Sequence, residues 1–166
     1  MRFFILSCVL IYSVSRYHDL SSLYLRGGCD TICYFAYPFI HASFLHLLLN
    51  MFVITSFYER FSRTEKTASF ISSIMTFPLA TMVGISDKPT VGASGIAFCM
   101  VGTYLSSLIY KFGITTFIKY LALTSILMAI QAIVSKGSIN WPIHYVSLIT
   151  STVLSYLYME WRNVRS

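Results

Sequence analysis

The chain has 166 residues, of which 56% are hydrophobic and 11% are charged, and its formal net charge is +6. Soluble domains carry about 25% charged residues, so the composition excludes an ordinary soluble domain and is typical of a polytopic membrane protein. The positive charge does not indicate a nucleic-acid partner, because the basic residues form no run and stand between apolar segments, as they do at the cytoplasmic ends of membrane spans.

Six apolar segments are candidate membrane spans, each of which needs roughly 20 residues. The first is similar to a signal-peptide core, but it lacks a small-residue cleavage site, so we interpret it as a retained span. The sequence therefore predicts an all-α membrane protein in which residues 1–166 form a single six-helix domain without a soluble part. In chain order the segments are 3–15, 45–58, 68–85, 95–110, 115–134 and 141–158.

The longest linker, residues 16–40, mixes tyrosine and phenylalanine with two adjacent glycines. It is too apolar to lie free in water, and we expect it in the membrane interface, where tyrosine is favoured. Its two cysteines, Cys29 and Cys33, can pair only if this loop faces an oxidising compartment, and the sequence leaves that open.

Basic residues predict the orientation of this integral, multi-pass protein. Those on the side of the two termini outnumber those on the other side by eight to four, which favours cytoplasmic termini. The first group is Arg2, Arg60, Arg63, Lys66, Lys111, Lys119, Arg162 and Arg165, and the second is Arg16, Arg26, Lys88 and Lys136.

The fourth segment is preceded by the tetrapeptide Gly92-Ala93-Ser94-Gly95. A polar group in a bilayer is costly and usually functional, so Ser94 is a candidate nucleophile. Two structural alternatives remain open. A helix can absorb a serine hydroxyl on a carbonyl one turn earlier, and small residues suit contacts between helices in lipid.

Three histidines and one asparagine accompany this serine at the same predicted face of the membrane. His46 and Asn50 are four residues apart and share one helix face, whereas His41 points elsewhere or precedes the helix. They either bond to neighbouring helices or donate hydrogen bonds to an oxyanion. His144 in the last segment is either a core histidine or the general base for Ser94.

The acidic residues limit the chemistry, because all of them lie in loops or at the ends of spans. None is placed to orient His144 as in a Ser-His-Asp triad, so nucleophilic catalysis would use a dyad. Their placement also argues against a proton-coupled carrier and an aspartyl protease. A zinc site on His41, His46 and His144 lacks a His-Glu-x-x-His motif and a nearby carboxylate, so no metal or other cofactor is expected. The acidic residues are Asp19, Asp30, Glu59, Glu65, Asp87 and Glu160.

In three motifs the chain resembles the rhomboid intramembrane serine proteases. The second segment carries His41-x4-His46-x3-Asn50, the fourth begins Gly92-Ala93-Ser94-Gly95-Ile96-Ala97-Phe98, and the sixth carries His144. The resemblance covers essentially the whole chain. It implies hydrolysis of a peptide bond in or near the transmembrane segment of a single-span or other membrane protein within the lipid bilayer.

The resemblance also implies roles for single residues. Ser94 would be the nucleophile, His144 its base, and His46, Asn50 and the Ser94 N–H the oxyanion hole. Residues 16–40 would be the half-submerged first loop. The supporting positions would be His41, near the mouth of a water-filled cavity, together with Gly92, Gly95 and Phe98, of which Phe98 would pack against His144.

The chain departs from the family pattern at two places. The last motif reads Ile143-His144-x-x-Ser147, where Ala-His-x-x-Gly is common, and the bulk of Ile143 could displace His144. Ile32-Cys33 stands where the first loop often has Trp-Arg. The serine and histidine are retained and no proline precedes the serine, which favours an active enzyme. The alternatives are an inactive rhomboid-like protein that binds or escorts transmembrane helices, and a small channel or carrier.

Overall fold

The computed structural model describes residues 1–86, 88–135 and 140–164, so Asp87, Lys136 and Arg165 lie outside it. The described part is helical and contains no strand, only an isolated antiparallel bridge between Leu25 and Thr90. The all-α class is thus confirmed. The elements are α1 (Arg2–Ser15), η1 (Ser21–Leu23), α2 (Cys33–Ala36), η2 (Tyr37–Phe39), α3 (Phe44–Arg60), α4 (Arg63–Gly84), α5 (Ser94–Phe112), α6 (Ile114–Ser135) and α7 (Trp141–Val164).

Each of the six apolar segments forms a helix: α1, α3, α4, α5, α6 and α7. By length and composition alone, α4 and α5 can each cross a bilayer. A third span results if residues 33–39 and α3, which meet at a 90° bend, count as one. Within the described residues, α1 and the first part of α6 are apolar but shorter. The full number of six spans therefore stays a prediction.

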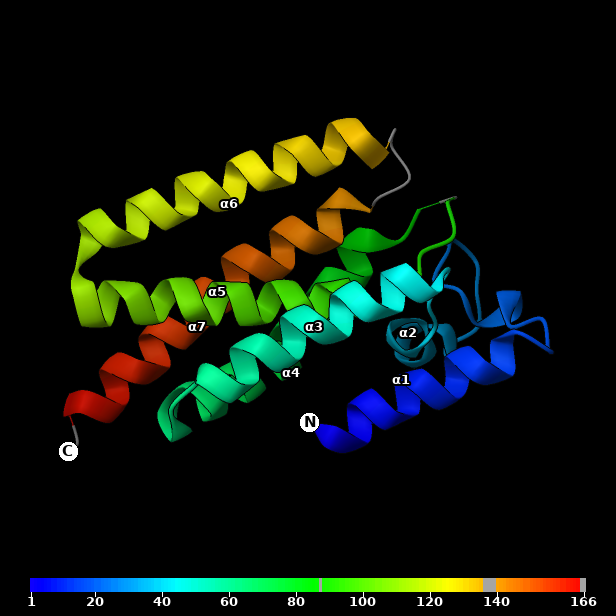
Figure 1. The fold of residues 1–166 in the computed structure, drawn as a ribbon, viewed down its shortest axis with the longest axis horizontal. Helices are drawn as coiled ribbons and strands as arrows, with labels where there is room; N and C mark the ends of the chain where they lie inside the picture. The colour runs from blue at the N-terminus through cyan, green and yellow to red at the C-terminus, as the bar shows by residue number, and fades with distance from the viewer. Residues whose placement is uncertain (87, 136–139, 165–166) are drawn as a thin grey trace.

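Helices α4, α5 and α7 form the centre of the bundle, and α3 and α6 pack against α5 (Figure 1). The approach of α5 to α7 is close because Gly102 lacks a side chain. A Cβ atom there would meet the Ser151 hydroxyl, the Leu148 carbonyl oxygen at 2.6 Å and the Thr152 nitrogen at 2.9 Å. Small residues at such crossings let helices associate in lipid, where no hydrophobic force drives them together.

Hydroxyl groups join the same three helices. Thr103 of α5 and Ser155 of α7 are 2.8 Å apart at their hydroxyl oxygens, and Ser155 also donates to Ser72 of α4 at 3.2 Å. Ser106 donates to the Thr152 carbonyl at 2.5 Å. Because a buried hydroxyl needs a partner, these bonds favour one register of the three helices.

The Gly102→Val variant is expected to unfold at a lower temperature than the wild type in detergent. The added carbons must displace backbone atoms of α7, and overpacking of this kind costs about 1–3 kcal/mol or more. Ala122→Val is the control, because Ala122 is exposed on α6. Equal thermal stability of the two variants would show that α5 and α7 do not approach each other at Gly102.

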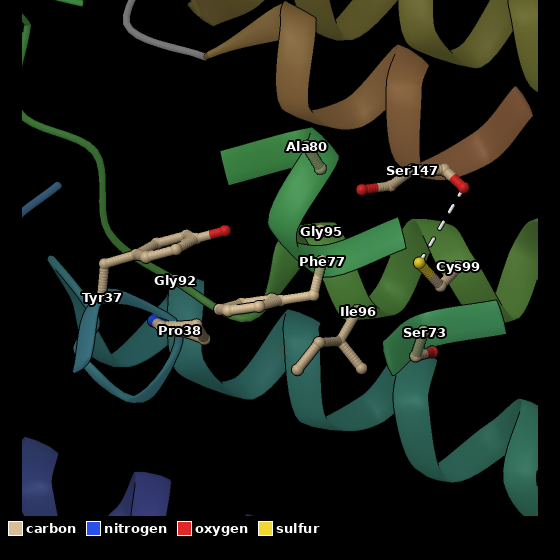
Figure 2. A pocket seen from close by; sticks show the side chains of 10 residues that line it. All are labelled: Tyr37, Pro38, Ser73, Phe77, Ala80, Gly92, Gly95, Ile96, Cys99 and Ser147. Atoms are coloured by element: carbon tan, nitrogen blue, oxygen red, sulfur yellow. Dashed lines mark hydrogen bonds between the residues drawn. The ribbon is translucent and has the colours of Figure 1, made fainter. Parts of the chain in front are cut away.

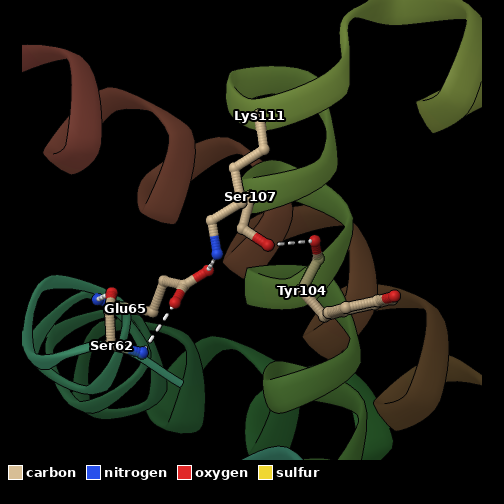
Figure 3. Close-up of polar contacts among 5 residues, drawn as sticks. All are labelled: Ser62, Glu65, Tyr104, Ser107 and Lys111. Atoms are coloured by element: carbon tan, nitrogen blue, oxygen red, sulfur yellow. Dashed lines mark hydrogen bonds and ion pairs between the residues drawn. The ribbon is translucent and has the colours of Figure 1, made fainter. Parts of the chain in front are cut away.

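An ion pair joins the first turn of α4 to the last turn of α5 (Figure 3). The Glu65 carboxylate accepts the Ser62 N–H at 2.7 Å as part of a capping box, and Lys111 at the end of α5 donates to it at 2.7 Å. Glu65 is only 4% exposed, so its charge needs both partners. The start of α4 is thus tied to the end of α5.

Candidate active site

Ser94 is the first residue of α5, and His144 lies in the first turn of α7. The two helices lie side by side, and the Ser94 Oγ and His144 Nε2 atoms are 2.9 Å apart. His144 is buried, whereas Ser94 is partly exposed. A hydroxyl within hydrogen-bond distance of an imidazole nitrogen is the arrangement of an activated nucleophile and its base.

Ile143 does not displace His144, contrary to the concern raised by its size. Its side chain is 1% exposed and lies over Gly84 of α4 and Gly95 of α5. A Cβ atom at Gly95 would lie 3.1 Å from Ile143 and 3.4 Å from the Ser147 hydroxyl, and one at Gly84 would overlap Ile143. The two glycines therefore provide the space that the isoleucine needs.

Aromatic rings hold the His144 imidazole. Phe98, one turn after Ser94, stacks on it with ring centres 4.5 Å apart and an interplanar angle of 23°. Trp141 meets it edge-on at 5.6 Å. His144 Nδ1 is buried and has no hydrogen-bond partner among the described residues. Ring packing thus orients the imidazole, whereas a triad would use a carboxylate for this purpose. The contact between Trp141 and His144 was not predicted from the sequence.

Gly92 brings the His46 and Asn50 side chains next to the serine turn. Its φ of +111° is a conformation that other residues rarely adopt. A Cβ atom at Gly92 would lie 2.6 Å from the His46 ring and 3.5 Å from Asn50 Nδ2. Asn50 is 7% exposed, and its Nδ2 has no partner in the described part of the chain. An unpaired buried donor is costly, and its position beside the turn that carries Ser94 makes it a candidate donor to an oxyanion.

His41 is hydrogen-bonded to the same turn, at Ala93. It precedes α3 and is buried, with 3% of its surface exposed. Its Nε2 accepts the Ala93 N–H at 3.4 Å, and its Nδ1 lies 3.3 Å from the Phe39 carbonyl oxygen. Because Nε2 accepts, the neutral ring carries its proton on Nδ1 and donates to Phe39. His41 thus holds Ala93 in place while Ser94 stays accessible.

The first loop is bonded to the segment that leads into Ser94. Leu25 and Thr90 exchange backbone hydrogen bonds of 3.1 and 2.8 Å, and the Gly27 N–H donates to the Ser86 carbonyl at 3.0 Å. The Gly92 N–H donates to the Tyr37 carbonyl at 2.9 Å. Sequence reasoning placed the loop in the interface but did not find these contacts, because backbone bonds leave no mark on residue type.

Asn140 is a further connection that the sequence did not reveal. Its side-chain amide donates to the Gly84 carbonyl at 2.6 Å and to the Thr90 hydroxyl at 2.7 Å. It stands directly before α7 and therefore joins the end of α4, the loop before Ser94 and the start of the His144 helix. The sequence shows only that Asn140 stands just before a helix. An asparagine at that position is equally typical of an N-cap residue, so these two hydrogen bonds could not be predicted from it.

A small cavity lies behind the serine turn, between the first loop and helices α4, α5 and α7 (Figure 2). Tyr37 stacks on Phe77 at 5.9 Å on one side of it, and the Cys99 thiol reaches the Ser147 carbonyl at 3.9 Å on the other. Its volume of about 10 Å³ has room for about one water molecule, so the side chains behind the serine turn are closely packed. The lining residues are Tyr37, Pro38, Ser73, Phe77, Ala80, Gly92, Gly95, Ile96, Cys99 and Ser147.

Within residues 1–86, 88–135 and 140–164, no three His, Cys, Asp or Glu side chains converge on one point as metal ligands would. Cys29 and Cys33 are both free thiols, and Cys33 donates to the Ser22 carbonyl at 3.2 Å.

A family model described as the rhomboid domain matches residues 29–161, which include His41, His46, Asn50, Ser94 and His144. The chain is also similar to rhomboid-type serine protease B from two strains of Aspergillus fumigatus, at 29% identity over 113 residues. This match covers 62% of the chain and 41% of the relative, so the chain spans less than half of that protein. No solved structure gives a significant match.

Proposed function

The chain belongs to the rhomboid family, and from this premise we propose that it is an intramembrane serine endopeptidase with a Ser94–His144 dyad. The observation that carries the proposal is the 2.9 Å distance between Ser94 Oγ and His144 Nε2 at the adjoining starts of α5 and α7. The homologous serine protease supports the enzyme class at the level of the family.

In the proposed reaction, His144 Nε2 takes the proton of Ser94 as the hydroxyl oxygen attacks the substrate carbonyl. The developing oxyanion accepts hydrogen bonds from the Asn50 amide, the His46 ring and the Ser94 N–H, which points out of the start of α5. His144 returns the proton to the leaving amine, and water then hydrolyses the acyl-enzyme by the same route. The Phe98 and Trp141 rings keep the imidazole in line during both steps.

The proposed substrate is a membrane protein whose transmembrane helix unwinds easily near the scissile bond. A stable helix uses its carbonyl groups in its own hydrogen bonds, so glycine, proline or polar residues nearby would expose the bond to attack. A small residue before that bond fits the family resemblance. The protein itself would be a single six-span domain with cytoplasmic termini and a site open to the opposite face.

Two observations support an active enzyme over an inactive helix-binding protein. Ile143 was the departure that motivated the inactive alternative, yet it packs over Gly84 and Gly95 while His144 stays beside Ser94. Asn50 also keeps a buried donor without a partner, which a helix-binding scaffold has no reason to retain.

A fluorophosphonate probe tests the proposal, because it forms a covalent bond only with an activated serine. We expect labelling of the wild type and of Ser147→Ala, which changes another serine of the same core. Ser94→Ala and His144→Ala should remain unlabelled, as read by in-gel fluorescence of protein in native membranes. Labelling that persists in Ser94→Ala, or a wild type that does not react, would rule out the proposed dyad.

A further inference from the structure

A second hollow lies at the end of the bundle away from Ser94 and His144. Helices α4 and α7 are antiparallel, since Asn140 at the start of α7 bonds to Gly84 at the end of α4. The start of α4 and the end of α7 therefore meet at the opposite end (Figure 1). There they border an open hollow of about 380 Å³, lined by Arg63, Thr64, Thr67, Tyr158 and Arg162.

Two guanidinium groups from different helices share this hollow, and none of the lining residues among positions 1–86, 88–135 and 140–164 is acidic. In the part of the chain that the structure describes, the single ion pair joins Lys111 to Glu65, and it leaves Arg63 and Arg162 without a carboxylate. Both arginines are exposed, so water screens their mutual repulsion, and an anion in the hollow would be attracted to both of them. The composition of the hollow therefore favours an anionic ligand.

The other lining groups are suited to phosphate oxygens. Thr64 and Tyr158 bring hydroxyl donors, while the Thr67 hydroxyl donates to the Arg63 carbonyl at 3.0 Å and fixes that turn of α4. Guanidinium groups present parallel N–H donors that match the spacing of phosphate oxygens. Two such groups together with hydroxyls form a recognition set for a phosphate monoanion or diester.

Apolar surface continues from the hollow along α4. Phe70 and Ile74 follow Thr67 by three and seven residues, so they lie on the same helix face, and they are 65% and 56% exposed. Tyr158 and Trp161, with ring centres 5.9 Å apart, stand at the end of α7 as interfacial aromatic residues do. A ligand that fits both parts has a phosphate and a long apolar chain.

We infer that this hollow binds the headgroup phosphate of an anionic phospholipid, with an acyl chain along Phe70 and Ile74. The site is independent of the dyad and does not rest on the proposed protease activity.

Thermal unfolding of the purified full chain in neutral detergent at low salt tests this inference. Phosphatidylglycerol, phosphatidylcholine and inorganic phosphate are titrated separately at equal concentrations. We expect phosphatidylglycerol to raise the unfolding midpoint with saturation, and the other two to have little effect. In Arg63→Gln/Arg162→Gln the apparent Kd for phosphatidylglycerol should rise at least about tenfold, since each basic group near a membrane contributes to anionic lipid binding.

The matched control is Arg60→Gln/Lys119→Gln, which removes the same charge from exposed positions that do not line the hollow. It should bind phosphatidylglycerol as the wild type does. Tyr158→Phe removes one hydroxyl without a change in charge and should weaken binding a few-fold, which guards against misfolding of the double variant. Equal loss in the control, or an equal response to phosphatidylcholine or to inorganic phosphate, would overturn the lipid site.

Discussion

Ser94→Ala and His144→Ala are each expected to abolish cleavage of a reporter protein with a single transmembrane segment. In the proposed mechanism the two side chains, 2.9 Å apart, act as nucleophile and base of one unit, and loss of either partner in a serine protease costs about 10⁶ in turnover. Because members of one unit are not additive, the double variant should be little worse than either single variant. Reporter cleavage after reconstitution into liposomes measures the effect.

Thermal stability in detergent provides the control for this pair of variants. Ser94 is partly exposed, so Ser94→Ala should unfold at nearly the wild-type temperature. Ser147→Ala, a change in the same core, should keep its activity. If Ser94→Ala still cleaved the reporter at a rate above background, a serine mechanism at this position would be wrong.

Asn50→Ala and His46→Ala are expected to lower kcat more than they raise KM. Loss of one donor to a developing oxyanion typically costs about 10² to 10³ in rate, or roughly 3–4 kcal/mol of transition-state stabilisation. Asn50 Nδ2 donates no hydrogen bond in the described structure, so its removal breaks no bond of the resting protein. The Asn50 variant should therefore lose activity with little loss of thermal stability.

His41→Ala provides the contrast for this experiment. His41 accepts the Ala93 N–H, so its removal leaves a buried donor without a partner. Its activity and unfolding temperature should fall together. If Asn50→Ala showed that same joint loss, its amide would be a structural link between helices and not a donor to the oxyanion.

Local patterns were sufficient to predict the six long helices of this protein, but not the short helices η1, α2 and η2 within residues 16–40. Apolar segments separated by charged or glycine-containing turns gave six helices at the expected places, since helix formation in lipid depends on the composition of each segment. The number of membrane spans was harder to predict from the sequence. Residues 33–39 meet α3 at a 90° bend, and composition does not show whether such a bent pair crosses the membrane.

The candidate site residues could be named from the sequence, but the residues that hold them in position could not. Spacing put His46 and Asn50 on one helix face, and the family motifs named Ser94 and His144. The contribution of Asn140 depends on Gly84 and Thr90, which are distant in the chain and reach it only when α4 and α7 pack together. Ile143 likewise appeared harmful because the glycine that faces it on α4 lies 59 positions earlier, at Gly84.

The bonds between Leu25 and Thr90 and between Gly27 and Ser86 join main-chain groups only. Every residue except proline has the same N–H and carbonyl groups, so mutation can change these side chains while the connection persists. These connections therefore tolerate changes of residue type, whereas the buried side chains of Leu25 and Cys33 in the same loop do not share that freedom. The connections are present in this chain although Ile32-Cys33 stands where the first loop of the family often has Trp-Arg.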